Sequence, residues 1–201
     1  MKKFFLIPLL LIGVILITSS CATLKVRQLK GSIGPQYSSI VGEDDCYKGK
    51  LGFYAGFSAG LMDMMSTSLR LRAGANISMQ GADYEEDFGG GEVIEGSTCL
   101  LYLNLPVVAR YQLENGFYGE AGLQPGFLLR ARDNTEGESY DYSDFVNSFD
   151  FGIPFGIGYE FQNNFDVGLR IIPGLTNINA GEFAETTDRN FIAALRISYT
   201  F

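Results

Sequence analysis

The sequence contains no histidine and no tryptophan, and only three cysteines occur among its 201 residues. Without histidine, the chain has no imidazole to act as a general base or as a zinc ligand. Basic residues are also few, because 15 lysines and arginines stand against 23 acidic residues and give a formal net charge of −8. An acidic chain cannot neutralise many phosphates, so we predict no nucleic-acid partner.

Long apolar runs are scarce as well, and the longest lies at the N-terminus. Lys2 and Lys3 precede the uncharged segment Phe4–Ile17, and small polar residues follow at 18–20. A basic start, an apolar centre and a small-residue end predict a secretory signal peptide over residues 1–20, cleaved from the mature protein. The apolar segment is shorter than the ~20 residues that a membrane-spanning helix needs. No later segment is long and apolar enough to form such a helix.

The three cysteines all fall in the exported part of the chain. Cys21 directly follows the small residues, where a lipobox places a lipidated cysteine, but Thr18 stands where Leu, Val or Ile is usual. Lipidation of Cys21 and plain cleavage therefore both remain open, with residues 21–28 as a periplasmic linker. Cys46 and Cys99 end two neighbouring predicted loops, and we predict a disulfide between them, since disulfides persist in an oxidising compartment.

From residue 29 to residue 201 the sequence alternates with a period of two. Successive side chains of a strand point to opposite faces, so each alternating segment predicts a strand with one apolar face. Eight segments show the pattern: 30–40, 51–61, 69–80, 101–113, 117–132, 149–161, 165–175 and 191–201. Short connections at 63–66, 114–115 and 163–164 alternate with long ones at 41–49, 81–98, 133–144 and 178–190. This pattern is typical of an all-β, eight-stranded antiparallel up-and-down transmembrane β-barrel over residues 29–201.

Glycine indicates which face of the strands is inside. Among the strand glycines, only Gly31 and Gly119 share the apolar parity, and the other twelve lie on the polar one. The lumen of an eight-stranded barrel has little room beyond side chains, so the glycine-bearing face belongs inside. The apolar face then points outward, which is tolerable only in lipid. We therefore predict a cell outer membrane location, with outer-membrane lipid as the surroundings of the barrel.

Charged residues fit this orientation. Of the 23 acidic residues, 17 lie in the four long loops, and only Glu120, Asp150, Glu160 and Asp166 lie on strands, all at inward positions. The inward basic residues are Lys30, Lys50, Arg70, Arg72, Arg110, Arg130, Arg132, Arg170 and Arg196. From these we predict a lumen ion-pair network of Arg70, Arg72, Arg110, Glu120, Arg130, Asp150, Glu160, Asp166, Arg170 and Arg196. Buried charges must be paired, which favours a filled lumen over an anion-selective pore, although the basic surplus supports the pore.

Several segments resemble a known family. The last strand ends with Tyr199 and Phe201, and this aromatic C-terminus resembles the signal read by the outer-membrane barrel-assembly machinery. The segments YLNLPVVARY (102–111), EAGLQPGFL (120–128) and FGIPFGIGYE (151–160), with residues 175–177, resemble the PorT-like outer-membrane barrels of Bacteroidota. This resemblance implies a single barrel in the outer membrane. The family member that gives it its name assists protein secretion, whereas most members have no assigned activity.

The sequence has few candidates for an enzymatic or metal site. Phospholipases, lipid A deacylases and omptin-type proteases of the outer membrane depend on histidine, which leaves carboxylate pairs such as Asp141 and Asp144 as the alternative acid–base groups. Acidic residues at 83–87 have oxygen ligands for Ca²⁺, but their spacing is not that of an EF-hand. We therefore predict no enzyme, no cofactor and no metal site. The predicted role is structural, interacting with an envelope or secretion protein, or secretion-accessory; a porin-like channel for small solutes or lipophiles is the alternative.

Overall fold

The computed structural model describes residues 27–42, 47–63, 68–87, 93–135, 137–181 and 186–201. The described part is almost entirely strand, with one short 3-10 helix at Ser143–Phe145. The strands are β1 (Arg27–Val41), β2 (Tyr47–Asp63), β3 (Leu69–Asp87), β4 (Val93–Asn104), β5 (Val107–Gln112), β6 (Phe117–Thr135), β7 (Glu138–Asp141), β8 (Phe149–Gly152), β9 (Phe155–Glu160), β10 (Phe165–Pro173) and β11 (Arg189–Thr200). No helix in these ranges is long and apolar enough to cross a membrane.

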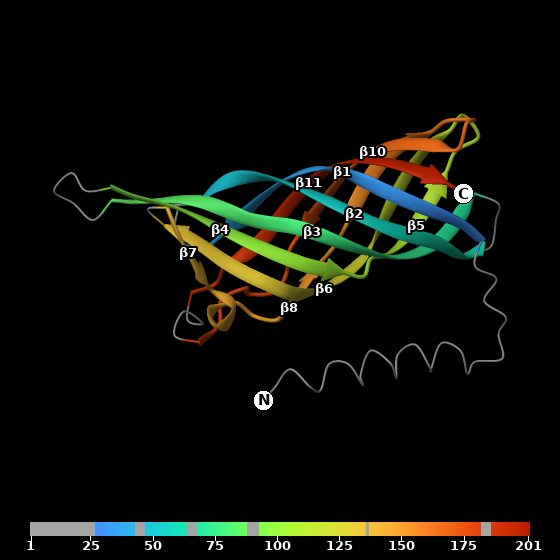
Figure 1. The fold of residues 1–201 in the computed structure, drawn as a ribbon. Coiled ribbons are helices and arrows are strands. Elements are labelled where there is room, and N and C mark those ends of the chain that lie inside the picture. The colour runs from blue at the N-terminus through green and yellow to red at the C-terminus, as the bar shows by residue number, and fades with distance from the viewer. Residues whose placement is uncertain (1–26, 43–46, 64–67, 88–92, 136, 182–185) are drawn as a thin grey trace.

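Antiparallel pairing closes the sheet into a barrel (Figure 1). β1 pairs with both β2 and β11, so the first and last strands complete the ring. β4 and β5 both pair with β3 and β6, and β8 and β9 lie one after the other along β6. Both interruptions contain a proline, Pro106 and Pro154, which lacks the N–H that a ladder needs. Each interrupted pair counts as one strand, and the short β7 pairs only with the end of β6 and lies off the ring, so the predicted eight-stranded up-and-down barrel is confirmed.

Two predicted loops are largely strand, and in the loop at 133–144 the end of β6 pairs with β7. Residues 81–98 are predicted as a connection, but β3 and β4 continue to pair with each other as far as Asp87 and Val93. Figure 1 shows this hairpin projecting beyond the barrel at the end opposite the C-terminus. Its acidic residues suggested a loop, yet charged side chains are compatible with a strand wherever water can solvate both faces. The sequence prediction therefore ended these two strands too early.

The described outer face is largely apolar, and the lumen toward the short turns is polar. Leu51 is 79% exposed and Ile157 67%, whereas Arg110 and Asp166 are 1% and 0% exposed. Glycine makes room on the inner face, because a Cβ at Gly158 would lie 2.4 Å from the Tyr118 ring. The outward Gly119 has no atom within 4 Å of such a Cβ. The predicted assignment of the glycine-bearing face to the lumen is confirmed.

The lumen is filled by different groups at its two ends. Toward the long loops lies an apolar cluster, which we call the loop-side core: Ile40, Ala82, Leu100, Tyr102, Ala131, Val146 and Ile178. Val146 and Ile178 come from loop segments that fold over the lumen, where Asn147 donates its backbone N–H to the Ile178 carbonyl (2.7 Å). Amide and hydroxyl groups occupy the middle, and the Gln36 side chain donates to Ser78 Oγ (2.9 Å). Toward the short turns lie charged groups.

Candidate functional site

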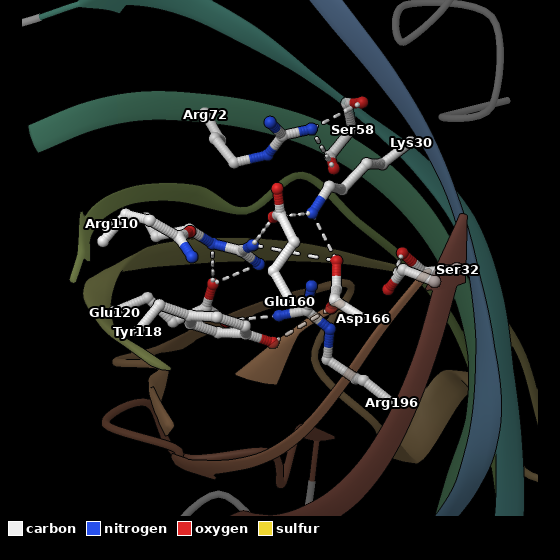
Figure 2. A network of polar contacts seen from close by, with 12 residues as sticks. Lys30, Ser32, Ser58, Arg72, Arg110, Tyr118, Glu120, Glu160, Asp166 and Arg196 are labelled. Atoms are coloured by element: carbon white, nitrogen blue, oxygen red, sulfur yellow. Dashed lines mark hydrogen bonds and ion pairs between the residues drawn. The ribbon is translucent and has the colours of Figure 1, made fainter. Parts of the chain in front are cut away.

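Glu120 is the centre of the charged region at the short-turn end of the lumen (Figure 2). Its Oε2 accepts hydrogen bonds from Arg110 Nε (3.2 Å) and Nη2 (3.1 Å). Its Oε1 accepts from Arg170 Nε (2.9 Å) and also contacts the Arg196 guanidinium. Glu120 is 6% exposed, so three guanidinium groups surround one buried carboxylate.

Strand register explains this arrangement. Glu120 on β6 lies directly opposite Arg110 on β5 and opposite Gly156 on β9. Arg170 on β10 lies opposite the same Gly156. Because glycine has no side chain, the Arg170 guanidinium can pass over β9 and reach the carboxylate of Glu120. An inward glycine between two charged strands is therefore what permits this ion pair.

A second set of ion pairs adjoins the first. Asp166 on β10 lies opposite Glu160 on β9, and two adjacent carboxylates need cations between them. Lys30 Nζ donates to Glu160 Oε2 (2.7 Å) and also contacts Asp166. Arg110 Nη1 lies 3.4 Å from Glu160 and 3.7 Å from Asp166. Arg110 thereby joins the two sets into one ion cluster, which consists of Lys30, Arg110, Glu120, Glu160, Asp166, Arg170 and Arg196.

Tyr118 adds a neutral donor to the ion cluster. Its hydroxyl donates to Asp166 Oδ1 (3.0 Å), and its ring packs against the Arg110 guanidinium carbon at 3.7 Å from the ring centroid. A cation over an aromatic face is attracted by the ring quadrupole. Lys30 was predicted to face inward but was left out of the network, and Tyr118 was not in it. Their inward parity was the available signal, but parity does not reveal which inward residues meet.

Four members of the predicted network lie outside the ion cluster, and three of them are Arg72, Arg70 and Asp150. Arg72 is buried, but it donates to the Gln28 carbonyl (3.0 Å) and to Ser58 rather than to a carboxylate. Arg70 reaches only the side chain of Gln28 (3.4 Å) among the described residues. Asp150 lies nearer the long-loop end of the lumen. It accepts hydrogen bonds from Asn190 Nδ2 (2.9 Å) and Thr176 Oγ1 (2.6 Å).

The prediction for Arg130 is wrong. The pairing of β4 with β6 shifts register between Leu101 and Tyr102, which places an extra residue, Leu129, in β6. Beyond this bulge the parity of β6 reverses, so Ala131 is fully buried and Arg130 and Arg132 are exposed on the outer face. A β-bulge adds one residue to one strand and turns every later side chain to the other face. Strict alternation along the sequence cannot reveal it.

The remaining predicted residues lie on the surface or outside the described ranges. Cys21 and Cys46 fall outside the described residues, so lipidation and the disulfide stay predictions; Cys99 is partly exposed on β4. Tyr199 packs edge-on against Phe201, with ring centroids 5.3 Å apart, and Tyr199 also contacts Phe165. Phe201 is 73% exposed, and its backbone N–H donates to the Leu29 carbonyl (2.9 Å). Their role as an assembly signal stays a prediction.

A pocket that the sequence analysis missed opens at the long-loop end of the barrel. This mouth pocket has a volume of about 390 Å³ and is lined by Tyr47, Tyr84, Ile94, Thr98, Asp133, Thr135, Tyr142, Asn179, Thr186 and Asp188. Tyr84 donates to Asp133 Oδ2 (2.6 Å), and Asn179 donates to Asp188 Oδ2 (2.9 Å). Four strands and two loop segments supply these side chains, so their convergence was not visible in the sequence.

The candidate metal ligands do not converge where the structure describes them. Within those ranges, no three of His, Cys, Asp and Glu are placed to hold a metal ion. Asp83 lies 3.9 Å from Lys50 Nζ, and Glu85 contacts Lys48. Two acidic groups of the β3–β4 hairpin, Asp83 and Glu85, thus lie close to lysines.

Comparisons with known proteins agree with the architecture. A family model described as outer membrane protein beta-barrel domain matches residues 28–180. Neisserial surface protein A is similar in structure, with a TM-score of 0.57 and 13% identity over 86% of this chain and 97% of that one. OprG of Pseudomonas aeruginosa scores 0.49 with 11% identity, over 88% and 97% of the two chains. Ail of Yersinia pestis scores 0.48 with 15% identity, over 88% and 99%.

The search of curated proteins found no match. The family match spans most of the barrel, from the second residue of β1 into the segment before β11. The closed antiparallel sheet, its apolar exterior and its polar lumen are the features that such a family requires of a membrane-spanning barrel. The chain is a cell outer membrane protein and belongs to the outer membrane protein beta-barrel domain family.

Proposed function

We propose that this chain is a non-enzymatic outer-membrane barrel whose lumen is closed and whose long acidic loops bind an envelope or secretion protein outside the membrane. The observation that carries this proposal is the filling of the lumen. Two cavities among the described residues of the lumen have volumes of about 30 and 20 Å³. Each has room for one or two water molecules at most, which is too little for a solute path.

Both ends of the lumen contribute to closure. At the short-turn end, the ion cluster spans the barrel from β1 to β5, β6, β9, β10 and β11. At the loop end, the loop-side core places fully buried Leu100 and Tyr102 beneath the folded loop segments. Opening a path would require breaking buried ion pairs or exposing apolar surface, and both are costly.

The external face supports the interaction role. In the orientation usual for such barrels, short turns face the periplasm and long loops face outward. The mouth pocket then opens outward, lined by three tyrosines and two carboxylates, beneath loops that hold most of the acidic residues. Tyrosine offers a large contact area with a polar tip, as protein-binding surfaces require. The absence of histidine argues against the acid–base chemistry of an enzyme.

Within the family, we place the chain among the PorT-like barrels. The segments that resemble them include both proline-containing strand interruptions and the β6 segment beside them. A secretion-accessory role would follow for this chain from that resemblance, with a surface component of a secretion system as the partner.

Planar-bilayer recording tests the closed lumen. The refolded protein should give no steady conductance, whereas Glu120→Ala, which removes the carboxylate shared by three arginines, should give transient leaks in the same bilayers. The leaks show that insertion and detection work. The surplus of basic groups in the lumen is the feature that favours the alternative, an anion channel. Steady, anion-selective conductance by the unaltered protein would overturn the closed-lumen proposal.

Crosslinking in intact envelopes tests the interaction role separately. Affinity capture should recover the same partner in repeated preparations with the unaltered protein, and with Asp150→Asn, which changes a lumen group. Asp133→Asn, which alters the mouth pocket, should lower the recovery. Equal recovery with both variants, at equal amounts of folded barrel, contradicts binding at the mouth.

A further inference from the structure

The charges of the short-turn lumen do not balance. The buried basic groups there are Lys30, Arg72, Arg110, Arg170 and Arg196, each at most 9% exposed. The acidic groups are Glu120, Glu160 and Asp166, so among the described residues the region has a surplus of two positive charges. An uncompensated charge in a low-dielectric interior is strongly unfavourable. A second anion source is therefore needed beyond these carboxylates.

Arg72 accounts for much of the surplus. Its guanidinium lies 3.0 Å from the Gln28 carbonyl and 3.3 Å from the carbonyl and hydroxyl of Ser58, all through one nitrogen, Nη2. No carboxylate of the described residues lies within ion-pair distance of it. Figure 2 shows its guanidinium directed to Ser58. The remaining nitrogens of a buried guanidinium are donors that need acceptors.

A small cavity lies beside these groups. Its volume is about 30 Å³, and its lining includes four guanidinium-bearing residues, Arg72, Arg110, Arg170 and Arg196, and a single acidic one, Glu120. Tyr54 also lines it, and its buried hydroxyl lies beside the Arg196 guanidinium, which can only donate, so the Tyr54 O–H has no acceptor among the described atoms. A buried O–H without an acceptor indicates an acceptor that protein atoms do not supply.

We propose that this cavity binds a monovalent halide, with chloride as the natural ligand. Arg72 and Tyr54 would donate hydrogen bonds to the ion, and the positive field of Arg170 and Arg196 would hold it. The ion removes half of the surplus charge and satisfies the orphan hydroxyl at once. A water molecule fits the volume but leaves the charge uncompensated. Phosphate, sulfate and organic acids are too large for a cavity of this size.

Anion-dependent stability tests the proposal. The folded barrel in neutral detergent should unfold at a higher temperature in sodium chloride or bromide than in sodium gluconate at equal ionic strength. Gluconate screens charges equally but cannot enter the cavity. The rise should saturate with halide concentration and reach roughly 2–4 °C or more. Equal midpoints in the two salts at every concentration overturn the proposal.

Variants locate the effect. Tyr54→Phe and Arg72→Gln should each reduce the halide-dependent shift, the former without altering the charge of the lumen. Arg70→Gln is the matched control, because Arg70 lies two residues from Arg72 on the same strand, has its hydrogen bond among the described residues to the Gln28 side chain, and does not line the cavity. The control should retain the full shift. An undiminished shift in Tyr54→Phe and Arg72→Gln would place the halide elsewhere and refute the site.

Crystals grown in bromide give a readout independent of stability. The anomalous difference map should show a bromide peak in the cavity lined by Arg72 and Tyr54, and the peak should be absent in Tyr54→Phe crystals. A cavity with density for water alone, in crystals that bind bromide on their surface, also refutes the proposal.

Discussion

The two ends of the lumen are filled by opposite kinds of side chain, charged at the short turns and apolar at the long loops. At the short-turn end, seven charged side chains form the ion cluster, and Asp166 is 0% exposed. At the loop end, the loop-side core buries Leu100 and Ala131 completely, with Val146 and Ile178 supplied by loops. A narrow lumen between strands must be filled in either case.

The difference follows from which chain segments can place side chains in the lumen at each end. The short-turn end has tight connections with no spare chain, so only strand side chains can fill it, and long arginines reach across the barrel. The loop end has long connections that fold back and bring apolar side chains with their own backbone hydrogen bonds, as between Ala180 N–H and the Phe145 carbonyl (2.8 Å). We expect the charged end to be less tolerant of substitution, because each removal leaves other ions unpaired.

Removing the central carboxylate should therefore have the largest effect. Glu120→Ala leaves Arg110, Arg170 and Arg196 without their shared partner and should lower the free energy of unfolding by about 3–5 kcal/mol. Urea titration of the refolded barrel measures this loss. Unfolding is followed by circular dichroism, because the chain has no tryptophan for fluorescence. Glu160→Ala is the control, since the Glu160 side chain is 27% exposed and should cost less. An equal or larger loss in Glu160→Ala contradicts the central position of Glu120.

Truncation in the loop-side core should come second. Leu100→Ala leaves a cavity among apolar neighbours and should cost about 2–4 kcal/mol, without leaving any ion unpaired. The same urea titration applies, with Leu101→Ala as control, because Leu101 lies next in the strand but faces away from this core. If Leu100→Ala lowers the free energy of unfolding by more than Glu120→Ala does, the loop end rather than the charged end contributes most to stability.

A methyl group on the inner wall distinguishes the two faces. Gly158→Ala places a Cβ 2.4 Å from the Tyr118 ring and should displace Tyr118 from Asp166, at a cost of about 1–3 kcal/mol. Gly119→Ala adds the same methyl on the outer face, where nothing lies within 4 Å, and should change stability by less than about 0.5 kcal/mol. Similar losses in both variants would contradict the assigned faces.

The smallest effect should come from the residue that the bulge turns outward. Arg130→Gln should alter the unfolding free energy by less than about 0.5 kcal/mol, because the side chain is exposed and belongs to no ion pair of the described residues. Arg110→Gln, one strand away in the ion cluster, should be clearly destabilising in the same assay. A loss in Arg130→Gln comparable to that in Arg110→Gln would restore Arg130 to the lumen network.

Much of the architecture could be predicted from the sequence because it depends on local period and composition. Alternation defines eight strands, and the placement of glycine on one parity defines the lumen face, since a narrow barrel excludes bulk on that side. Inward parity also brought Arg110, Glu120 and Arg170 into one predicted set. The strand ends of the β3–β4 hairpin were missed, because strand pairing in water does not require an apolar face.

What the sequence determined by itself is the side of the sheet on which a residue lies, wherever the period of two continues unbroken. Only the tertiary structure decided which inward residues meet, because register places Gly156 between Glu120 and Arg170 and Asp166 beside Glu160. It also decided the position of Arg130, since one extra residue in β6 reverses every later side chain. Register and bulges arise from pairing between strands that are distant in the chain, and no local pattern encodes that pairing.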